Sequence, residues 1–199
     1  GMLLVLEHKK TNNIVSLSPD LRHVLSIREN RDTREAVYYR PYYHFLALPK
    51  EVLPYPTAGQ FKVKWLADDA AAVTYKAADS TIHQFIGTYG SRDGLSYYYV
   101  GPSIYGRWSG PDAVVIAGQQ GIEVRHGGRS ESFDWDQVVQ FGTLAVVLVR
   151  EGEARWTISL NENFKIQSES LVPPIGDITL YQATMEKNKP VKLAYAGQE

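Results

Sequence analysis

Hydrophobic and polar side chains alternate with a period of two along most of the chain. This period is typical of β-strands, and no apolar stripe with the 3.6-residue period of a helix is present. Turn-forming residues recur at short intervals between the runs. The predicted strands are residues 14–18, 22–28, 36–47, 61–66, 71–77, 81–88, 95–100, 113–117, 121–125, 129–134, 143–150, 154–160, 164–168, 177–185 and 190–195. The pattern therefore predicts a mostly β, antiparallel fold with little helix.

Two of these runs are apolar on both faces, AVVIA at 113–117 and LAVVLV at 144–149. We expect both to be central strands covered on both sides, since exposure would leave half of their apolar side chains in water. The stretch WTISLNENFKI at 156–166 predicts a hairpin that turns at Asn161–Asn163, because Asn tolerates the backbone of a tight turn.

The segment GPSIYGRWSGP at 101–111 is rich in glycine and proline and separates two kinds of strand. The strands before it are rich in tyrosine, and those after it are rich in valine and isoleucine. We expect two antiparallel β modules, residues 2–104 and 105–199, each a sandwich or a partial barrel. One continuous sandwich is the alternative.

A weak internal repeat suggests a further alternative. VSLSPDLRHVLSI at 15–27 and VKWLADDAAAVTY at 63–75 align without gaps, and each contains two strand-like runs around an acidic turn. The first copy resembles the SPDG-type blade hairpin of β-propellers such as the TolB family, with Leu21 in place of the glycine. This resemblance implies a small propeller-like array of hairpin repeats. Any antiparallel hairpin, however, has a similar pattern.

Composition and charge exclude several kinds of chemistry. The net charge is −1, which does not favour binding to nucleic acid or an anionic membrane. The chain has no cysteine, which excludes disulfides, thiolate metal sites and cysteine nucleophiles. No apolar stretch approaches the roughly 20 residues that span a bilayer, so no transmembrane segment is predicted.

The first residues bear on the expected compartment. Gly1 before Met2 is typical of a residue left by tag cleavage, and the apolar run that follows ends at Glu7. That run is too short for a signal peptide, so a cytoplasmic location is the default if Met2 is the natural start. If an anchor precedes it in the natural protein, an extracytoplasmic location is expected instead.

Tyrosines cluster in two tracts, AVYYRPYYHFLALP at 36–49 and SYYYVGPSIYGRW at 96–108. Both place aromatic side chains on both faces of a strand, so one face is free for a second layer or for a partner. Rigid aromatic side chains with polar tips suit a binding surface for a glycan, a peptide or another protein. The candidate ligand-binding residues are Tyr42, Tyr43, Tyr98, Tyr105 and Trp108. The alternative is structural, because tyrosine also favours half-buried strand positions.

Candidates for catalysis are few. The five histidines show no metal-binding spacing, and only His44 lies beside a tyrosine tract. In FDWD at 133–136, an extended backbone would place Asp134 and Asp136 on one face, where two carboxylates suit cation binding or acid–base catalysis. The alternative is that they cap a turn or face solvent. Serine-nucleophile and phosphate-loop motifs are absent, and neither a metal nor a cofactor is predicted.

The sequence therefore favours a non-catalytic binding or interaction protein that uses an aromatic surface. A glycan-directed hydrolase with Asp134, Asp136 and His44 as catalytic candidates is the second hypothesis. A structural β domain, whose aromatic faces pair the two modules or two protomers, is the third.

Overall fold

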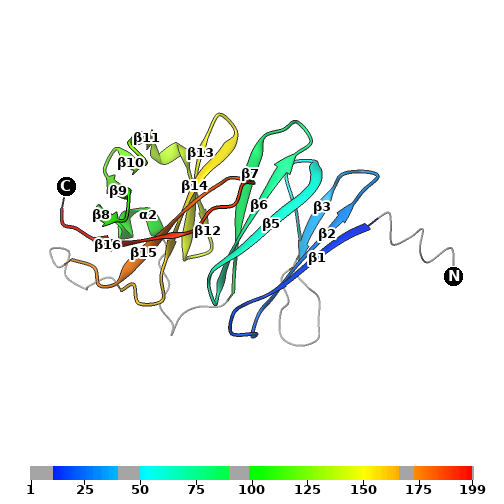
Figure 1. The fold of residues 1–199 in the computed structure, drawn as a ribbon, viewed down its shortest axis with the longest axis horizontal. Coiled ribbons are helices and arrows are strands. Elements are labelled where there is room, and N and C mark those ends of the chain that lie inside the picture. Colours follow the sequence, from blue (N-terminus) through cyan, green and yellow to red (C-terminus); the bar gives the residue numbers. More distant parts are fainter. Residues whose placement is uncertain (1–10, 40–49, 90–98, 166–172, 199) are drawn as a thin grey trace. The chain divides into compact units, whose positions relative to one another are not determined.

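The structure, a computed structural model, describes residues 11–39, 50–89, 99–165 and 173–198 (Figure 1). It confirms the mostly β fold, because the described strands form antiparallel sheets and the described helices are single turns. The chain divides into two compact units, Gly1–Tyr89 and Gly90–Glu199. This division comes earlier in the chain than residue 105, where the sequence composition changes. In the part of the chain that is described, no helix is long and apolar enough to cross a membrane.

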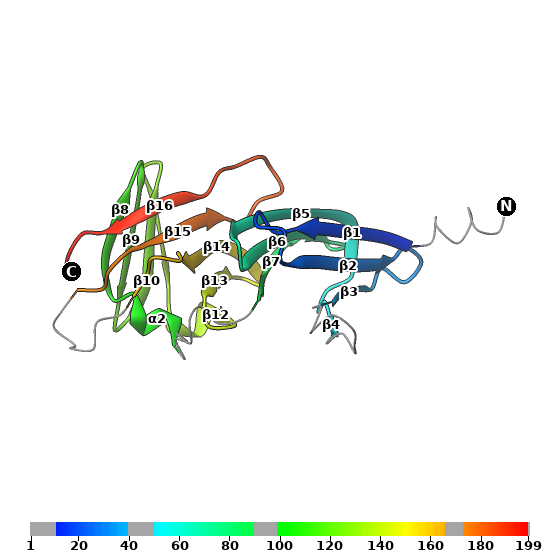
Figure 2. The same cartoon turned by 90° about the horizontal axis from the view of Figure 1, so that it is seen from below.

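The first unit contains two sheets. Its strands are β1 (Thr11–Leu17), β2 (Val24–Asn30), β3 (Ala36–Tyr39), β4 (Lys50–Val52), β5 (Thr57–Ala67), β6 (Ala70–Ala77) and β7 (Ile82–Thr88). The first four form one sheet in the order β1-β2-β3-β4, and the other three form a second in the order β5-β6-β7. Figure 2 shows β1, β2 and β3 running alongside one another.

The core of the first unit lies between these two sheets. Leu25 and Ile27 of β2 and Tyr38 of β3 are buried in one cluster with Val73 and Tyr75 of β6. The alternate residues of each strand point to the same face, which brings these side chains together. Each fully buried aliphatic side chain contributes roughly 1.5–3 kcal/mol to folding.

The two copies of the internal repeat are hairpins, but they do not form propeller blades. Residues 15–27 cover the β1–β2 hairpin and residues 63–75 cover the β5–β6 hairpin. These hairpins belong to different sheets, and those sheets share one core. The described sheets have four, nine and three strands, whereas a propeller repeats four-stranded blades. The propeller-like alternative is therefore wrong.

The described residues of the second unit form a single sheet of nine strands. Its elements are α2 (Val100–Ser103), β8 (Gly106–Gly110), β9 (Ala113–Gly118), β10 (Gly121–His126), β11 (Arg129–Phe133), the 3₁₀-helix η2 (Trp135–Gln137), β12 (Val138–Phe141), β13 (Ala145–Arg150), β14 (Glu153–Leu160), β15 (Asp177–Gln182) and β16 (Val191–Tyr195). The strand order is β11-β10-β9-β8-β16-β15-β14-β13-β12. Because η2 connects the two end strands, the sheet curls into a nearly closed, barrel-like form.

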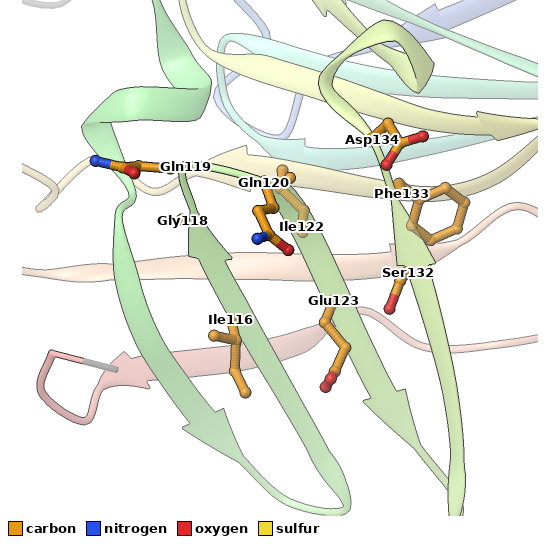
Figure 3. A pocket seen from close by; sticks show the side chains of 10 residues that line it. Ile116, Gly118, Gln119, Gln120, Ile122, Glu123, Ser132, Phe133 and Asp134 are labelled. Carbon is orange, nitrogen blue, oxygen red and sulfur yellow. The ribbon is translucent and has the colours of Figure 1, made fainter.

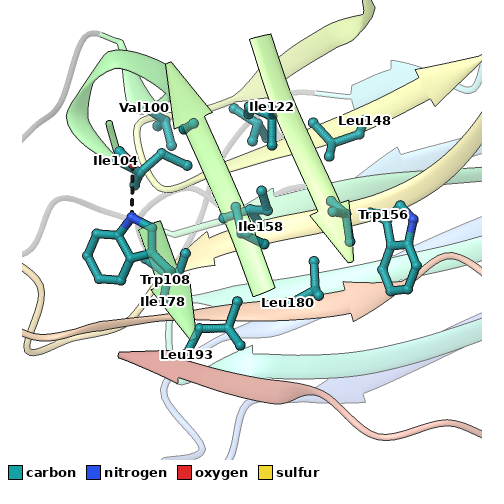
Figure 4. Close-up of a cluster of buried hydrophobic side chains, with 14 of the residues drawn as sticks. Val100, Ile104, Trp108, Ile122, Leu148, Trp156, Ile158, Ile178, Leu180 and Leu193 are labelled. Atoms are coloured by element: carbon teal, nitrogen blue, oxygen red, sulfur yellow. Dashed lines mark hydrogen bonds between the residues drawn. The ribbon is translucent and has the colours of Figure 1, made fainter. Parts of the chain in front are cut away.

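A large apolar core fills the concave side of this sheet (Figure 4). Trp108 of β8, Ile122 of β10 and Ile158 of β14 are almost fully buried within it. Val100 and Ile104, at the two ends of the α2 segment, belong to the same cluster, which explains why the compact unit begins before residue 105.

The two runs that are apolar on both faces are central strands, as predicted. The run at 113–117 forms most of β9, which pairs with β8 and β10. The run at 144–149 forms most of β13, which pairs with β12 and β14.

The predicted hairpin at 156–166 is wrong in its pairing. β14 ends at Leu160, and its two neighbours are β13 and β15. Lys165 instead forms an isolated bridge with Ile175. Both edges of β14 are therefore occupied by strands from other parts of the chain.

Candidate ligand-binding surface

The structure places two of the predicted binding residues in different environments, and three lie outside the described residues. The three outside the described residues are Tyr42, Tyr43 and Tyr98. The catalytic candidate His44 also lies outside them. Tyr105 lies between α2 and β8 and is 37% exposed. Trp108 has no exposed surface, and its Nε1 donates a hydrogen bond to the Ile104 carbonyl at 2.9 Å (Figure 4). Trp108 is thus a core residue, because it occupies a β8 position that faces the sheet interior.

The exposed ring of Tyr105 stacks on Trp135 of η2, with 6.0 Å between the ring centroids and 30° between their planes. Gly101 of α2 closely approaches the six-membered ring of Trp135. A Cβ atom at Gly101 would lie 2.3 Å from Cζ3 of Trp135, closer than any side chain tolerates. Trp135 is therefore fixed by α2 and by Tyr105.

Backbone and side-chain hydrogen bonds hold this aromatic pair in place. Nε1 of Trp135 donates to the carbonyls of Gly118 and Gln119, both at 3.0 Å. The Val100 amide donates to Oε1 of Gln140 at 2.8 Å, which attaches α2 to β12. Three segments that are distant in sequence thus meet at Trp135.

A pocket of about 560 Å³ lies at the β9–β10 turn and along β9, β10 and β11 (Figure 3), and neither Tyr105 nor Trp135 is among the residues that line it. Ile116, Glu123 and Ser132 are neighbours across the three strands and lie along its floor. Gln119 and Gln120 line it from the β9–β10 turn. The lining is mostly polar and offers amide, hydroxyl and carboxylate groups to a ligand.

Two residues of the pocket, Gln119 and Asp134, are linked to Trp135. Gln119 lines the pocket and accepts the Trp135 hydrogen bond on its carbonyl, and Asp134 lines the pocket and precedes Trp135. We call the Tyr105–Trp135 pair together with the polar pocket residues the ligand surface; those pocket residues are Gln119, Gln120, Glu123, Ser132 and Asp134.

The two acidic side chains of the pocket already have local partners. Glu123 forms a bidentate ion pair with Arg125. Nε of Arg125 donates to Oε1 of Glu123 at 2.9 Å, and Nη2 donates to Oε2 at 3.3 Å. Asp134 is the N-cap of η2, where its side chain accepts from the Gln137 amide. Oε1 of Gln137 in turn accepts from the Asp134 amide at 3.0 Å. This reciprocal arrangement is a capping box.

The predicted Asp134–Asp136 pair depended on an extended backbone through both residues. β11 ends at Phe133, the backbone of Asp134 is still extended, and Asp136 lies within η2. The helical turn therefore replaces the period-two geometry on which the pairing rested, and Asp134 takes the alternative role of a cap. Among the described residues, no group of three or more His, Asp or Glu side chains is placed to hold a metal ion.

Several tyrosines of the first unit have a structural role. Tyr38, Tyr75 and Tyr89 are buried, and the Tyr38 hydroxyl donates to that of Tyr89 at 3.2 Å. Burial, with a smaller contribution from the nearby Tyr55, raises the pKa of Tyr75 above its ordinary range. The core of the first unit therefore uses tyrosine as a large, mainly apolar side chain.

Sequence reasoning named Tyr105 but missed Trp135, Gln119 and Gln120. Trp135 stands between two aspartates, and that pattern drew attention to the carboxylates alone. The only local sign of a functional role for Trp135 was its position between two polar residues, beside the end of a predicted strand. Its contacts with Tyr105 and Gly118 depend on pairings between distant segments.

The sequence matches no protein-family model, and neither a curated protein nor a solved structure has significant similarity to it. The chemistry of the ligand surface is therefore the basis for inferring a function.

Proposed function

We propose that this protein is a non-catalytic binding protein whose ligand surface binds a glycan. The observation that carries the proposal is the stacked Tyr105–Trp135 pair, which is linked through the Gln119 carbonyl and through Asp134 to a polar pocket of about 560 Å³. A sugar ring has an apolar C–H face and a rim of hydroxyl groups. Aromatic rings suit the first, and amide, hydroxyl and carboxylate groups suit the second.

The pocket chemistry supports a neutral sugar. Gln119, Gln120 and Ser132 each offer both donors and acceptors, as hydroxyl groups require. The Glu123 carboxylate is balanced by Arg125, and the Asp134 carboxylate accepts the Gln137 amide in the capping box, so each acidic side chain of the pocket has a local partner.

Isothermal titration against a panel of neutral oligosaccharides tests the proposal. We expect saturable binding that weakens by up to about tenfold in Tyr105→Ala, because stacking on a sugar contributes on the scale of other aromatic contacts, about 0.5–1.5 kcal/mol. Gln120→Ala should weaken binding without changing the fold, since Gln120 is exposed at a turn.

Tyr55→Ala is the matched control. Tyr55 is 39% exposed and also stacks on one ring, that of His83, but it belongs to the first unit. Equal loss of affinity in both tyrosine variants would contradict the proposal, as would no binding to any sugar. Release of cleaved sugar during the titration would instead support the hydrolase hypothesis, with Asp134→Asn as its next variant.

A further inference from the structure

The edge strand β1 has an unusual combination of properties. It is seven residues long and has β2 as its single neighbour in the described sheet. Its sequence, TNNIVSL, contains no charged residue, no proline and no glycine. Edge strands normally carry charged residues or proline, because these prevent pairing with other chains.

A second edge strand of the same unit shows the usual protection. β5 carries Lys62 and Lys64, and its pairing with β6 is irregular between Thr57 and Phe61 and between Trp65 and Ala67. Charges and bulges of this kind disfavour addition of another strand. β1 has neither, and its pairing with β2 is regular from Thr11 to Leu17.

The direction of the free backbone groups follows from the register. The Ser18 amide donates to the His23 carbonyl at 2.9 Å, so Ser18 directs its backbone groups toward β2. By alternation Ser16, Ile14 and Asn12 do the same. The amides and carbonyls of Thr11, Asn13, Val15 and Leu17 therefore point away from the sheet.

From this edge we propose that β1 is a homodimer interface, on which β1 of a second copy pairs antiparallel about a two-fold axis at Ile14. This axis places Thr11 opposite Leu17 and Asn13 opposite Val15 of the other chain. Each of these pairs joins two residues with outward-pointing groups, so every free amide finds a carbonyl. A register shifted by one residue would pair outward groups with inward ones and leave them unsatisfied.

Charge and side-chain exposure favour a second copy over another partner. A two-fold axis brings like residues close together, so self-pairing suits a strand without charges. Val15 and Leu17 are 66% and 53% exposed, and the two-fold pairing would cover part of both. A single strand pair buries less than the roughly 1,200 Å² of a typical stable interface, so the dimer should depend on protein concentration.

Sedimentation equilibrium over a wide concentration range gives the first test. We expect the mass to approach twice the chain mass of 22.4 kDa at high concentration. In Val15→Pro we expect the dissociation constant of the dimer to rise about tenfold or more, because two intermolecular hydrogen bonds are lost. The ladder with β2 should persist, since the Val15 amide points outward and proline is tolerated there. Val15→Thr keeps the amide and should dimerise as the unchanged chain does.

Cross-linking tests the register. Opposed residues at Ile14 would form a non-hydrogen-bonded pair with Cα atoms about 4.5 Å apart, within the range that a disulfide requires. Because the chain has no cysteine, Ile14→Cys should give a single disulfide-linked dimer on mild oxidation. Val52→Cys, an exposed position on β4, should cross-link far less.

A chain that stays monomeric at every concentration overturns the proposal, even if β1 binds an extended peptide from another protein. A dimer that is unchanged in Val15→Pro and is not cross-linked by Ile14→Cys also overturns it. If Val15→Pro fails to fold, Val15→Lys tests the proposal instead. It places one lysine of each copy near the two-fold axis, and repulsion between these like charges should abolish the dimer.

Discussion

Leu21 occupies a backbone conformation that leucine rarely adopts. Its φ angle is 63°, in the left-handed region, at the tip of the β1–β2 hairpin. The turn is held by Ser18 Oγ, which donates to Oδ1 of Asp20 at 2.6 Å and accepts from the His23 amide at 3.0 Å. The hydrogen bonds to Asp20 from Ser18 and from the Arg22 amide lower the pKa of this carboxyl. The resembled SPDG motif has glycine where this chain has Leu21.

Replacing Leu21 by glycine should therefore stabilise the protein. The left-handed conformation costs a residue with a Cβ atom about 1 kcal/mol, and the greater freedom of glycine in the unfolded chain offsets part of that gain. We expect the free energy of unfolding in urea to rise by about 0.5–1 kcal/mol. Leu21 is 72% exposed, so little burial is lost.

Leu21→Ala is the matched variant, since it removes the exposed side chain but keeps the Cβ atom. It should leave stability within about 0.5 kcal/mol of the unchanged chain. A loss of stability in Leu21→Gly would show that the leucine side chain itself stabilises the turn.

At the scale of elements, α2 shows how a short helix depends on its packing. A helix of four residues is not stable alone, and α2 is fixed by the Val100–Gln140 hydrogen bond and by contact of Gly101 with Trp135. The absence of a side chain at Gly101 is what allows the Trp135 ring to lie there.

Gly101→Ala should displace the Trp135 ring. Overpacking of this kind costs about 1–3 kcal/mol of unfolding free energy, which urea denaturation measures. The same variant should weaken sugar binding, because Trp135 belongs to the ligand surface. Ser103→Ala in the same helix removes one hydrogen bond to the Tyr99 carbonyl at 2.7 Å and should leave sugar affinity unchanged. Wild-type stability in Gly101→Ala would contradict the close packing.

At the scale of the whole second unit, the gap in the nine-stranded sheet is closed by side chains. Glu131 of β11 accepts from Nε and Nη2 of Arg155, both at 3.1 Å, and from Nη1 of Arg150 at 3.3 Å. Nε1 of Trp156 donates to it at 3.3 Å. The guanidinium of Arg150 also lies over the Phe133 ring, 4.6 Å from its centroid. An ion-pair network here takes the place of a β-ladder.

Stability should depend on Glu131 in a pH-dependent way. Burial raises the pKa of this carboxyl, but the hydrogen bonds from Arg155 and Trp156 and the two arginine charges outweigh it, so the pKa lies below its ordinary value. A lowered folded pKa contributes stability that is present above the unfolded value of about 4.3 and is lost as the pH falls through the folded pKa.

Glu131→Gln should lower the unfolding free energy at pH 7 by about 1–2 kcal/mol. This effect is smaller than that of a fully buried ion pair, because both arginines are partly exposed and solvent screens their charges. The difference from the unchanged chain should shrink below about pH 4, as urea titrations at several pH values would show. Glu123→Gln is the control, since its Arg125 pair lies two residues away on one strand and should contribute less than about 0.5 kcal/mol. Equal effects of both variants would contradict a closing role for Glu131.

The sequence by itself determined where most strands lie, and its lack of cysteine excluded disulfides, thiolate metal sites and cysteine nucleophiles. Alternation is a local property, so the run at 113–117 identified a central strand, and the same reasoning located β10 and β14 within a few residues. At Asp136 a local assumption failed because of a turn, since the period-two pattern does not show its helical backbone.

Only the tertiary structure decided which strands pair and which aromatic residues reach the surface. Trp108 and Tyr105 stand three residues apart, yet one is fully buried and the other exposed, because Trp108 faces the sheet interior from β8 and Tyr105 lies in the connection before that strand. β14 pairs with β15 across a long connection, and Trp135 meets Tyr105 through contacts among three segments. Burial and pairing depend on residues distant in sequence, and a local pattern carries no record of them.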